Sequence, residues 1–350
     1  MNARVAAILV VLLVVLGGGA LLYQQQERGR RPENVGTLGR TLFKDLKVAD
    51  IAAIKIVEPS ASPNATLTLQ RKDDRWVIAE RADFPADLSR VREFVLKVIG
   101  LKVGQSEPLG DKDRARLNLD ASGTRVEFAG ADGKALGSFI VGRKYFKREV
   151  DNPDKAIPDG RFVGLPGEAG TAYLVGDPLA QATVKTAEWI ERSSFQVEKV
   201  KTLQVRYPGG DAWRIDRAGD NAEWKLAGAK PGEKLDISRA NAASYSLSLL
   251  ELADIAPKEA KDTGLEQPIA VGAATLEGAS YAIKVGKLGG ENYGRDNYFV
   301  TFTASGLKPD AKDAERVKLL SQHVLLIPKS KLEDTLKKRA ELLEKQKSKK

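Results

Sequence analysis

Hydrophobic positions form one continuous run at the start of the chain and short alternating segments afterwards. Residues 5–23 carry no charged side chain, and a helix of that length spans about the 30 Å of a bilayer core at 1.5 Å per residue. Three glutamines follow the run. The pattern therefore predicts a transmembrane anchor over residues 1–27 and a linker over residues 28–44. A cleavable signal peptide is the alternative, because Gly18 and Ala20 supply small residues at cleavage-like spacing.

Beyond the linker, the hydrophobic periods indicate both strands and helices. Strict alternation at residues 66–70, 212–216 and 279–285 is typical of half-buried antiparallel strands. Residues 91–101 instead place apolar side chains three and four positions apart, which is the pattern of a helix with one apolar face. Because one face of each sheet then needs a cover, we expect an α+β fold in which antiparallel sheets are packed by helices.

The chain also repeats its own pattern after about 150 positions. Each copy contains an alternating strand, a Trp-containing hairpin, an Asp before a helical run (residues 91–101 and 240–252), and a Val-Gly dipeptide followed by a basic residue. We expect both Trp side chains to lie in the core. The pattern predicts tandem duplicated units, with a first α+β repeat over residues 45–195, a second over residues 196–335 and a Lys-rich C-terminal tail over residues 336–350. The paired positions are Ile51 with Val200, Trp76 with Trp224, Asp87 with Asp236, and Gly142 with Gly286.

Composition excludes several classes of site. The chain contains no Cys and a single His, His323, which rules out disulfides, thiolate nucleophiles and any metal site that needs two imidazoles. The net charge is +9, but residues 329–350 carry nine basic and four acidic residues, so more than half of the excess lies in one segment. The remaining residues have interspersed signs, which does not predict nucleic-acid binding.

Catalytic motifs are missing or misplaced. No glycine-rich phosphate loop ending in Gly-Lys-Ser/Thr occurs. Ser305 and Lys308 match the Ser-x-x-Lys signature of acyl enzymes, but Gly306 and Pro309 disfavour the helix that this chemistry needs. We therefore expect a non-enzymatic protein with no catalytic residues, no metal site and no cofactor.

Two segments combine basic and aromatic residues and are candidate interfaces. Exposed Arg and Tyr side chains are favoured at protein–protein contacts. The alternative is a charged hairpin that protects a sheet edge. The candidate interface residues are Arg143, Tyr145 and Phe146 in the first repeat and Lys287, Tyr293 and Arg295 in the second.

These motifs together resemble a known family. They are an Asp-Ile-x-x-Ile-x-Ile opening at Asp50, an Arg-x-x-x-x-Trp hairpin that ends at Trp76, an Asp-Leu helix cap at Asp87, and the Val-Gly-Arg/Lys hairpins. With the N-terminal apolar run, the pattern over about residues 40–335 is similar to the bacterial family named domain of unknown function 4340. The resemblance implies a single-span envelope protein that accompanies ABC-type transport components of the gliding-motility kind, and it assigns no catalytic residue.

The resemblance and the predicted anchor define the functional hypotheses. We expect a membrane-tethered envelope protein that acts as an accessory or partner-binding subunit of an ABC-type transport system. Its partners would be the transporter or other envelope subunits, and the membrane through the N-terminal helix. The alternative is a module that binds an envelope glycan or peptide in the cleft between the repeats. The expected location is the bacterial inner membrane with the bulk of the chain periplasmic, although Arg28, Arg30 and Arg31 after the span favour the cytoplasmic side by the positive-inside rule.

Overall fold

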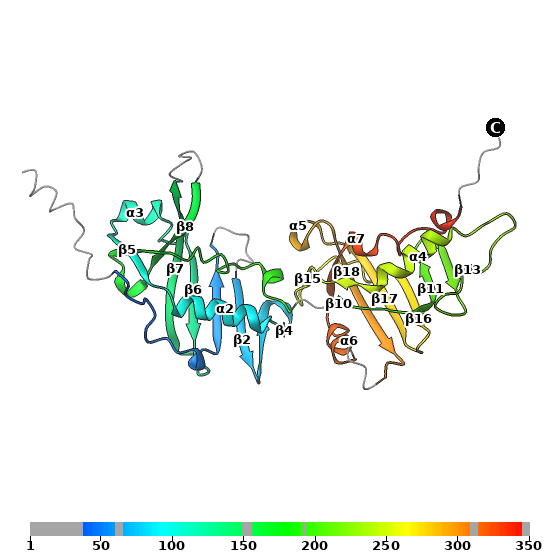
Figure 1. Ribbon diagram of the computed structural model, residues 1–350, viewed down its shortest axis with the longest axis horizontal. Helices are drawn as coiled ribbons and strands as arrows, with labels where there is room; N and C mark the ends of the chain where they lie inside the picture. Colours follow the sequence, from blue (N-terminus) through cyan, green and yellow to red (C-terminus); the bar gives the residue numbers. More distant parts are fainter. Residues whose placement is uncertain (1–37, 60–65, 149–155, 192–193, 309–313, 345–350) are drawn as a thin grey trace, which may run out of the picture. The chain divides into compact units, whose positions relative to one another are not determined.

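The fold is mixed α and β, with two antiparallel sheets and few helices. The chain divides into two compact units. The first unit comprises the described residues up to Thr66 together with Arg92–Val184. The second unit comprises Leu67–Val91 together with the described residues from Lys185 onward. The repeat boundary expected at residues 195 and 196 stays a prediction. The computed structural model describes residues 38–59, 66–148, 156–191, 194–308 and 314–344 (Figure 1).

The predicted membrane anchor, residues 1–27, lies outside the described residues. Among the residues that the structure describes, no helix combines the length and the apolarity needed to cross a bilayer.

The first sheet contains nine strands in the order β4-β3-β2-β1-β6-β7-β8-β9-β5. Its hairpin turns fall where the chain adopts left-handed backbone, at Asp73 between β2 and β3 (φ 52°) and at Gly133 between β6 and β7 (φ 77°). The strands are β1 Ala53–Val57, β2 Thr66–Lys72, β3 Arg75–Ile78, β4 Phe84–Pro85, β5 Val103–Pro108, β6 Thr124–Ala129, β7 Ala135–Arg148, β8 Ala156–Gly164 and β9 Thr171–Val175.

Helix α2 (Leu88–Ile99) lies across this sheet (Figure 1). Asp87 precedes it, and its Oδ1 accepts a hydrogen bond from the backbone N–H of Ser89 at 2.9 Å, which satisfies a donor that the first helical turn leaves unpaired. Phe94 on the apolar stripe is fully buried, and its ring centroid lies 6.4 Å from that of Phe128 on β6. The predicted helix and its Asp cap are confirmed, with the helix beginning three residues before the apolar stripe.

The second sheet contains eight strands in the order β13-β12-β11-β16-β17-β18-β19-β15, and β10 and β14 form a separate pair. Helix α4 (Ile237–Tyr245) follows Asp236, whose carboxylate accepts a hydrogen bond from the backbone N–H of Arg239 at 3.2 Å. The strands are β10 Ser194–Phe195, β11 Val200–Arg206, β12 Ala212–Asp216, β13 Lys225–Leu226, β14 Leu250–Glu251, β15 Asp254–Ile255, β16 Ile269–Thr275, β17 Ser280–Leu288, β18 Asn297–Ser305 and β19 Leu325–Pro328.

Helix α4 is shorter than the helical run expected at residues 240–252. The 3-10 turn η6 (Ser246–Ser248) follows it, and Leu250 already belongs to β14. The hydroxyl of Ser246 donates to the carbonyl of Ala243 at 3.2 Å, and that of Ser248 donates to the carbonyl of Tyr245 at 2.7 Å. Serine hydroxyls that bond to nearby carbonyls compete with helical hydrogen bonding, which accounts for the early end of the helix.

The remaining helical elements are short. The α-helices are α3 Asp111–Arg116, α5 Gly290–Tyr293, α6 Ala314–Leu320 and α7 Lys329–Leu332, and the 3-10 turns are η2 Val48–Asp50, η3 Ala79–Arg81, η4 Pro166–Glu168, η5 Thr186–Glu188 and η7 Arg339–Leu342.

The two sheets follow the same path along the chain. Numbered in chain order, and leaving out the edge strand β4, each sheet has the spatial order 3-2-1-5-6-7-8-4. In each, the main helix falls between the third and fourth strands along the chain. Strands β6 to β9 therefore occupy the same places in the first sheet as β16 to β19 in the second.

A bulge in the first sheet explains the Val-Gly-Arg motif. The register of β7 against β8 shifts between Val141 and Lys144. There, the backbone N–H of Arg143 donates to the carbonyl of Leu117 at 2.7 Å. A Cβ atom on Gly142 would lie 2.4 Å from that carbonyl oxygen, so this position cannot hold a side chain without moving the backbone.

The second sheet has a bulge at the corresponding place in β17. The backbone N–H of Lys287 donates to the carbonyl of Thr263 at 2.8 Å, and a Cβ atom on Gly286 would lie 2.1 Å from that oxygen. The residue after each accepting carbonyl also adopts left-handed backbone, with φ 53° at Asn118 and 70° at Gly264. The same local geometry thus accounts for the glycine in both Val-Gly-Arg/Lys motifs.

The two repeated Trp residues differ in burial. Trp224 is 3% exposed, which confirms its expected place in the core. Trp76 on β3 is only half-buried and lies opposite Arg71 on β2. The prediction that both Trp side chains lie in the core is therefore confirmed for Trp224 and only partly for Trp76.

Residues 329–344, here called the C-terminal strap, pack against the second sheet and helix α4. Leu332 and Leu342 are fully buried. The indole N–H of Trp213 on β12 donates to the carbonyl of Lys337 at 2.7 Å, and the backbone N–H of Asp236 donates to the carbonyl of Leu342 at 2.9 Å. Residues 336–344, expected to begin a solvated tail, are therefore packed into this unit.

The contact between Tyr207 and the strap predicts a pH effect. The Tyr207 hydroxyl donates to the carbonyl of Leu336, and burial raises the pKa of Tyr207 to about 12. An unfolded chain has a Tyr pKa of about 10, so the folded state holds this proton more tightly. The resulting stabilisation is complete below about pH 10 and is lost as the pH rises towards 12. In urea denaturation across that window, we expect the free energy of unfolding to fall more steeply for the wild type than for Tyr207→Phe. Equal slopes would contradict this assignment.

Candidate functional site

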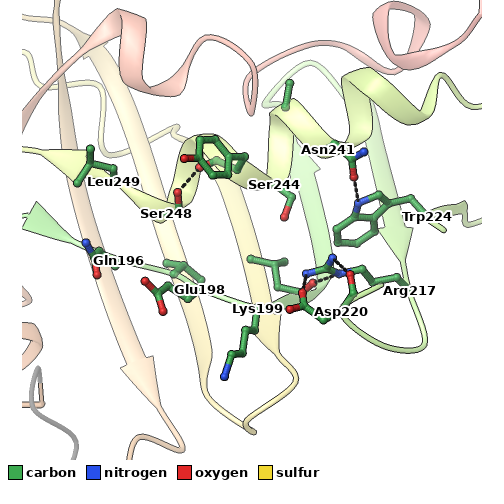
Figure 2. A pocket seen from close by; sticks show the side chains of 14 residues that line it. Gln196, Glu198, Lys199, Arg217, Asp220, Trp224, Asn241, Ser244, Ser248 and Leu249 are labelled. Atoms are coloured by element: carbon green, nitrogen blue, oxygen red, sulfur yellow. Dashed lines mark hydrogen bonds and ion pairs between the residues drawn. The ribbon is translucent and has the colours of Figure 1, made fainter. Parts of the chain in front are cut away.

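The second unit contains an open groove of about 840 Å³ (Figure 2). Its walls come from the segment that joins β10 to β11, from the loop between β12 and β13, and from α4 and η6. Figure 2 shows Gln196, Glu198 and Ser248 towards one end of the groove and Trp224 and Asn241 towards the other. The volume falls within the range of small-ligand and peptide sites.

One end of the groove is a fixed wall of interlocked side chains. The indole N–H of Trp224 donates to Asn241 Oδ1 at 3.0 Å. The Arg217 guanidinium carbon lies 4.8 Å from the centroid of the Trp224 ring, close enough for a cation–π contact. The same guanidinium pairs with Asp220 at 2.8 Å and donates through Nε to the carbonyl of Val200 at 2.6 Å. The charges of Arg217 and Asp220 are therefore paired with each other within the wall, and the linked contacts hold the wall rigid.

The other end of the groove carries exposed apolar surface. The Tyr245 side chain at the end of α4 is 78% exposed, and Leu249 after η6 is 42% exposed. Both line the groove. Val197 holds the opposite wall in place, because its side chain is buried and its backbone N–H donates to the carbonyl of Leu247 at 3.0 Å. A rigid frame thus presents an aromatic and an aliphatic side chain to solvent, as protein–protein contact sites do.

The charges along the groove are partly paired. Lys199 forms an ion pair with Glu277 at 2.6 Å, and this hydrogen bond raises the pKa of Lys199 and lowers that of Glu277. Glu198 is exposed, and it forms no ion pair with any residue that the structure describes. The groove therefore offers an exposed carboxylate beside amide and hydroxyl groups, a set suited to non-covalent binding of a polar or basic group.

The first predicted interface segment lies on β7. Arg143 and Phe146 are exposed, and Tyr145 is half-buried with its ring 6.1 Å from that of Phe162 on β8. Register pairs Tyr145 with Gly160. The exposed basic and aromatic side chains expected in the first unit are thus present on one strand, and Tyr145 belongs partly to the packing of the sheet.

The second predicted interface segment spans β17 and α5. Lys287 and Arg295 are exposed, and Arg295 forms an ion pair with Glu291. The Tyr293 ring instead packs edge-on against Phe299, with centroids 5.2 Å apart, in a small apolar cluster. Tyr293 is therefore mainly a packing residue, and the segment presents less free aromatic surface than expected.

Neither the Ser-x-x-Lys match nor the single histidine lies in surroundings that indicate catalysis. Ser305 ends β18 and Gly306 has φ 68°, so Ser305 and Lys308 do not share a helical face. His323 is half-buried, with its ring 5.1 Å from that of Phe84, and burial lowers its pKa. Among the described residues, no group of three or more His, Asp or Glu side chains could hold a metal ion.

The groove was not predicted from the sequence. Tyr245 and Leu249 fell inside a helical run expected to extend to residue 252, and Glu198 lay just before the strand expected to open at Val200. The serines at positions 246 and 248 are the one local signal that the helix ends early. Trp224 was singled out, and its place in the core is what allows it to support Asn241.

Comparison with known proteins identifies one matching protein family. No curated protein and no solved structure matches the chain. The model of one family, described as domain of unknown function (DUF4340), matches residues 76–268, from β3 of the first sheet to the segment before β16. The match covers more than half of the chain, and the chain therefore belongs to the DUF4340 family.

Proposed function

We propose that this protein is a non-enzymatic binding subunit of the bacterial cell envelope, and that the groove of the second unit holds a segment of a partner protein. The observation that carries this proposal is the exposure of Tyr245 and Leu249 on a rigid frame beside the exposed carboxylate of Glu198. A partner segment with an apolar residue next to a Lys or Arg would meet complementary groups in this groove.

The partner in this proposal is an ABC-type transport component. The family resemblance supports that choice, and residues 5–23 supply a tether with the length of a membrane span. The bulk of the chain would then lie in the periplasm, next to the transporter.

We also infer that the chain arose by tandem duplication of one α+β unit. The shared strand order, the Asp cap before each main helix and the glycine bulges at Gly142 and Gly286 support this inference. Only the second unit carries the exposed Tyr at the end of its main helix, so the proposed binding function belongs to that unit.

Co-purification of the tagged full-length chain from bacterial membranes tests the partner. We expect ABC-type transport proteins to co-purify with the wild type and their recovery to fall at least tenfold with Tyr245→Ala combined with Glu198→Gln. Both side chains are exposed, so the free energy of unfolding should change by less than about 0.5 kcal/mol. Leu96→Ala is the matched control, because Leu96 is an exposed apolar residue on the main helix of the other sheet. Equal recovery from all three proteins would contradict the proposal.

An envelope glycan is the second candidate occupant. The amides of Gln196 and Asn241 and the carboxylate of Glu198 line the groove with hydrogen-bonding groups, and sugars are bound by such groups beside an aromatic ring. Binding of soluble envelope glycan fragments by the wild type, and its loss in Glu198→Gln, would favour this occupant over a polypeptide.

A further inference from the structure

Arg161 on β8 has unusual surroundings. Its strand neighbour two positions on, Val163, is fully buried, so Arg161 lies on the core face at the end of the first sheet's core. The Arg161 Nε atom is buried and has no hydrogen-bond partner. It is the one buried side-chain nitrogen or oxygen atom without a partner among the residues that the structure describes.

A second positive charge lies directly across the strand pair. Register places Lys144 of β7 opposite Arg161, and Val175 of β9 on its other side. Like charges at directly opposed positions destabilise a sheet, and a buried donor without an acceptor costs about 1–3 kcal/mol. Two unfavourable features thus coincide at one place in the sheet.

The carboxylate of Glu58 offsets the positive charge of Arg161 only in part. Burial lowers the pKa of Arg161, and the negative charge of Glu58 opposes that effect only in part. One oxygen of Glu58, Oε1, accepts the backbone N–H of Val184 at 3.2 Å. No described residue forms an ion pair with Arg161 or Lys144. The site therefore retains positive charge and an unused donor.

We propose that Arg161 and Lys144 form a binding site for an oxyanion, a phosphate or carboxylate group carried by a ligand. A guanidinium binds such groups through paired N–H donors, and an ammonium adds a point charge to them. An anion bound by the guanidinium and the ammonium would offset the two opposed positive charges. The site lies in the first unit, so it is additional to the groove and does not depend on it.

Thermal unfolding of the full-length chain in different anions at constant ionic strength tests the site. We expect inorganic phosphate or acetate to raise the midpoint of the first unit relative to chloride, and the stronger of the two identifies the anion class. Arg161→Gln should abolish the increase, and Lys144→Gln should raise the apparent dissociation constant about tenfold. Arg143→Gln is the matched control, because Arg143 is an exposed basic residue next to Lys144 on the same strand, and it should retain the full response.

The variants also separate binding from a purely structural role. Without an anion, Arg161→Gln should unfold at the same midpoint as the wild type or higher, since it removes a half-buried charge whose Nε has no partner. If neither phosphate nor acetate shifts the wild-type midpoint relative to chloride, the proposal is overturned. A shift that persists in Lys144→Gln at full affinity overturns it as well, even if Arg161→Gln does not fold.

Discussion

Replacing Gly286 by Ala should lower the free energy of unfolding of the second unit by about 2–4 kcal/mol. The added Cβ would lie 2.1 Å from the carbonyl oxygen of Thr263, so the backbone must move, and the 2.8 Å hydrogen bond that Lys287 donates to the same carbonyl would be strained or lost. Gly142→Ala should have a similar effect in the first unit, where the corresponding distance to the Leu117 carbonyl is 2.4 Å. Urea denaturation followed by Trp fluorescence and circular dichroism measures both.

Matched controls exist for each glycine. At Gly209 and Gly137, an added Cβ atom would have no heavy atom within 4 Å, and neither residue has a positive φ. Gly209→Ala and Gly137→Ala should therefore change the stability by less than about 1 kcal/mol. A loss in the control variants as large as in Gly286→Ala and Gly142→Ala would show that the bulges are not the cause.

Truncating Leu342 should destabilise the second unit by about 2–5 kcal/mol, although it lies only eight residues before Lys350. Its side chain is fully buried, and its carbonyl accepts the hydrogen bond from Asp236 at the start of α4. Leu342→Ala would leave a cavity beneath the strap. Glu333→Gln is the control, because Glu333 is exposed on the same segment and its replacement should be neutral within about 0.5 kcal/mol. If Leu342→Ala is equally neutral, the strap is not part of the folded unit.

Local sequence rules predicted the elements of this fold well where one face of an element is buried. The hairpin between Arg71 and Trp76 forms with these two residues in register, and the Asp caps at Asp87 and Asp236 begin their helices as expected. Alternation and capping are short-range effects, so a few neighbouring residues are enough to determine them.

Local sequence rules did not predict how the C-terminal strap packs. Leu332, Leu336 and Leu342 among many lysines have the spacing of an amphipathic surface helix, and α7 is indeed short and helical. Backbone contacts join this end of the strap to residues about a hundred positions earlier in the chain: the carbonyl of Leu342 accepts from Asp236, and Leu343 forms a β-bridge with Leu235. Hydrophobic period alone does not reveal which distant surface an apolar side chain will meet.

Local sequence rules also did not predict the two proposed binding sites. Tyr245 and Leu249 lie at the end of α4 and after η6, on the side away from the buried Ala240 and Leu247, and hydrophobic period alone does not show that such exposed side chains line a groove. Arg161 stands in an alternating strand where a charged residue normally faces solvent, but its Nε is buried. Both sites depend on exceptions to the average behaviour of their residue types.

Cross-linking from position 245 in intact cells tests the partner-binding groove most directly. The chain contains no Cys, so Tyr245→Cys introduces a single thiol, and Leu96→Cys provides the matched exposed position elsewhere. We predict that a membrane-impermeant, thiol-reactive cross-linker added to intact cells with a permeable outer membrane labels both variants, and that Tyr245→Cys alone forms an adduct with an ABC-type transport subunit. An unlabelled thiol at position 245, or the same adduct from both positions, would contradict the account.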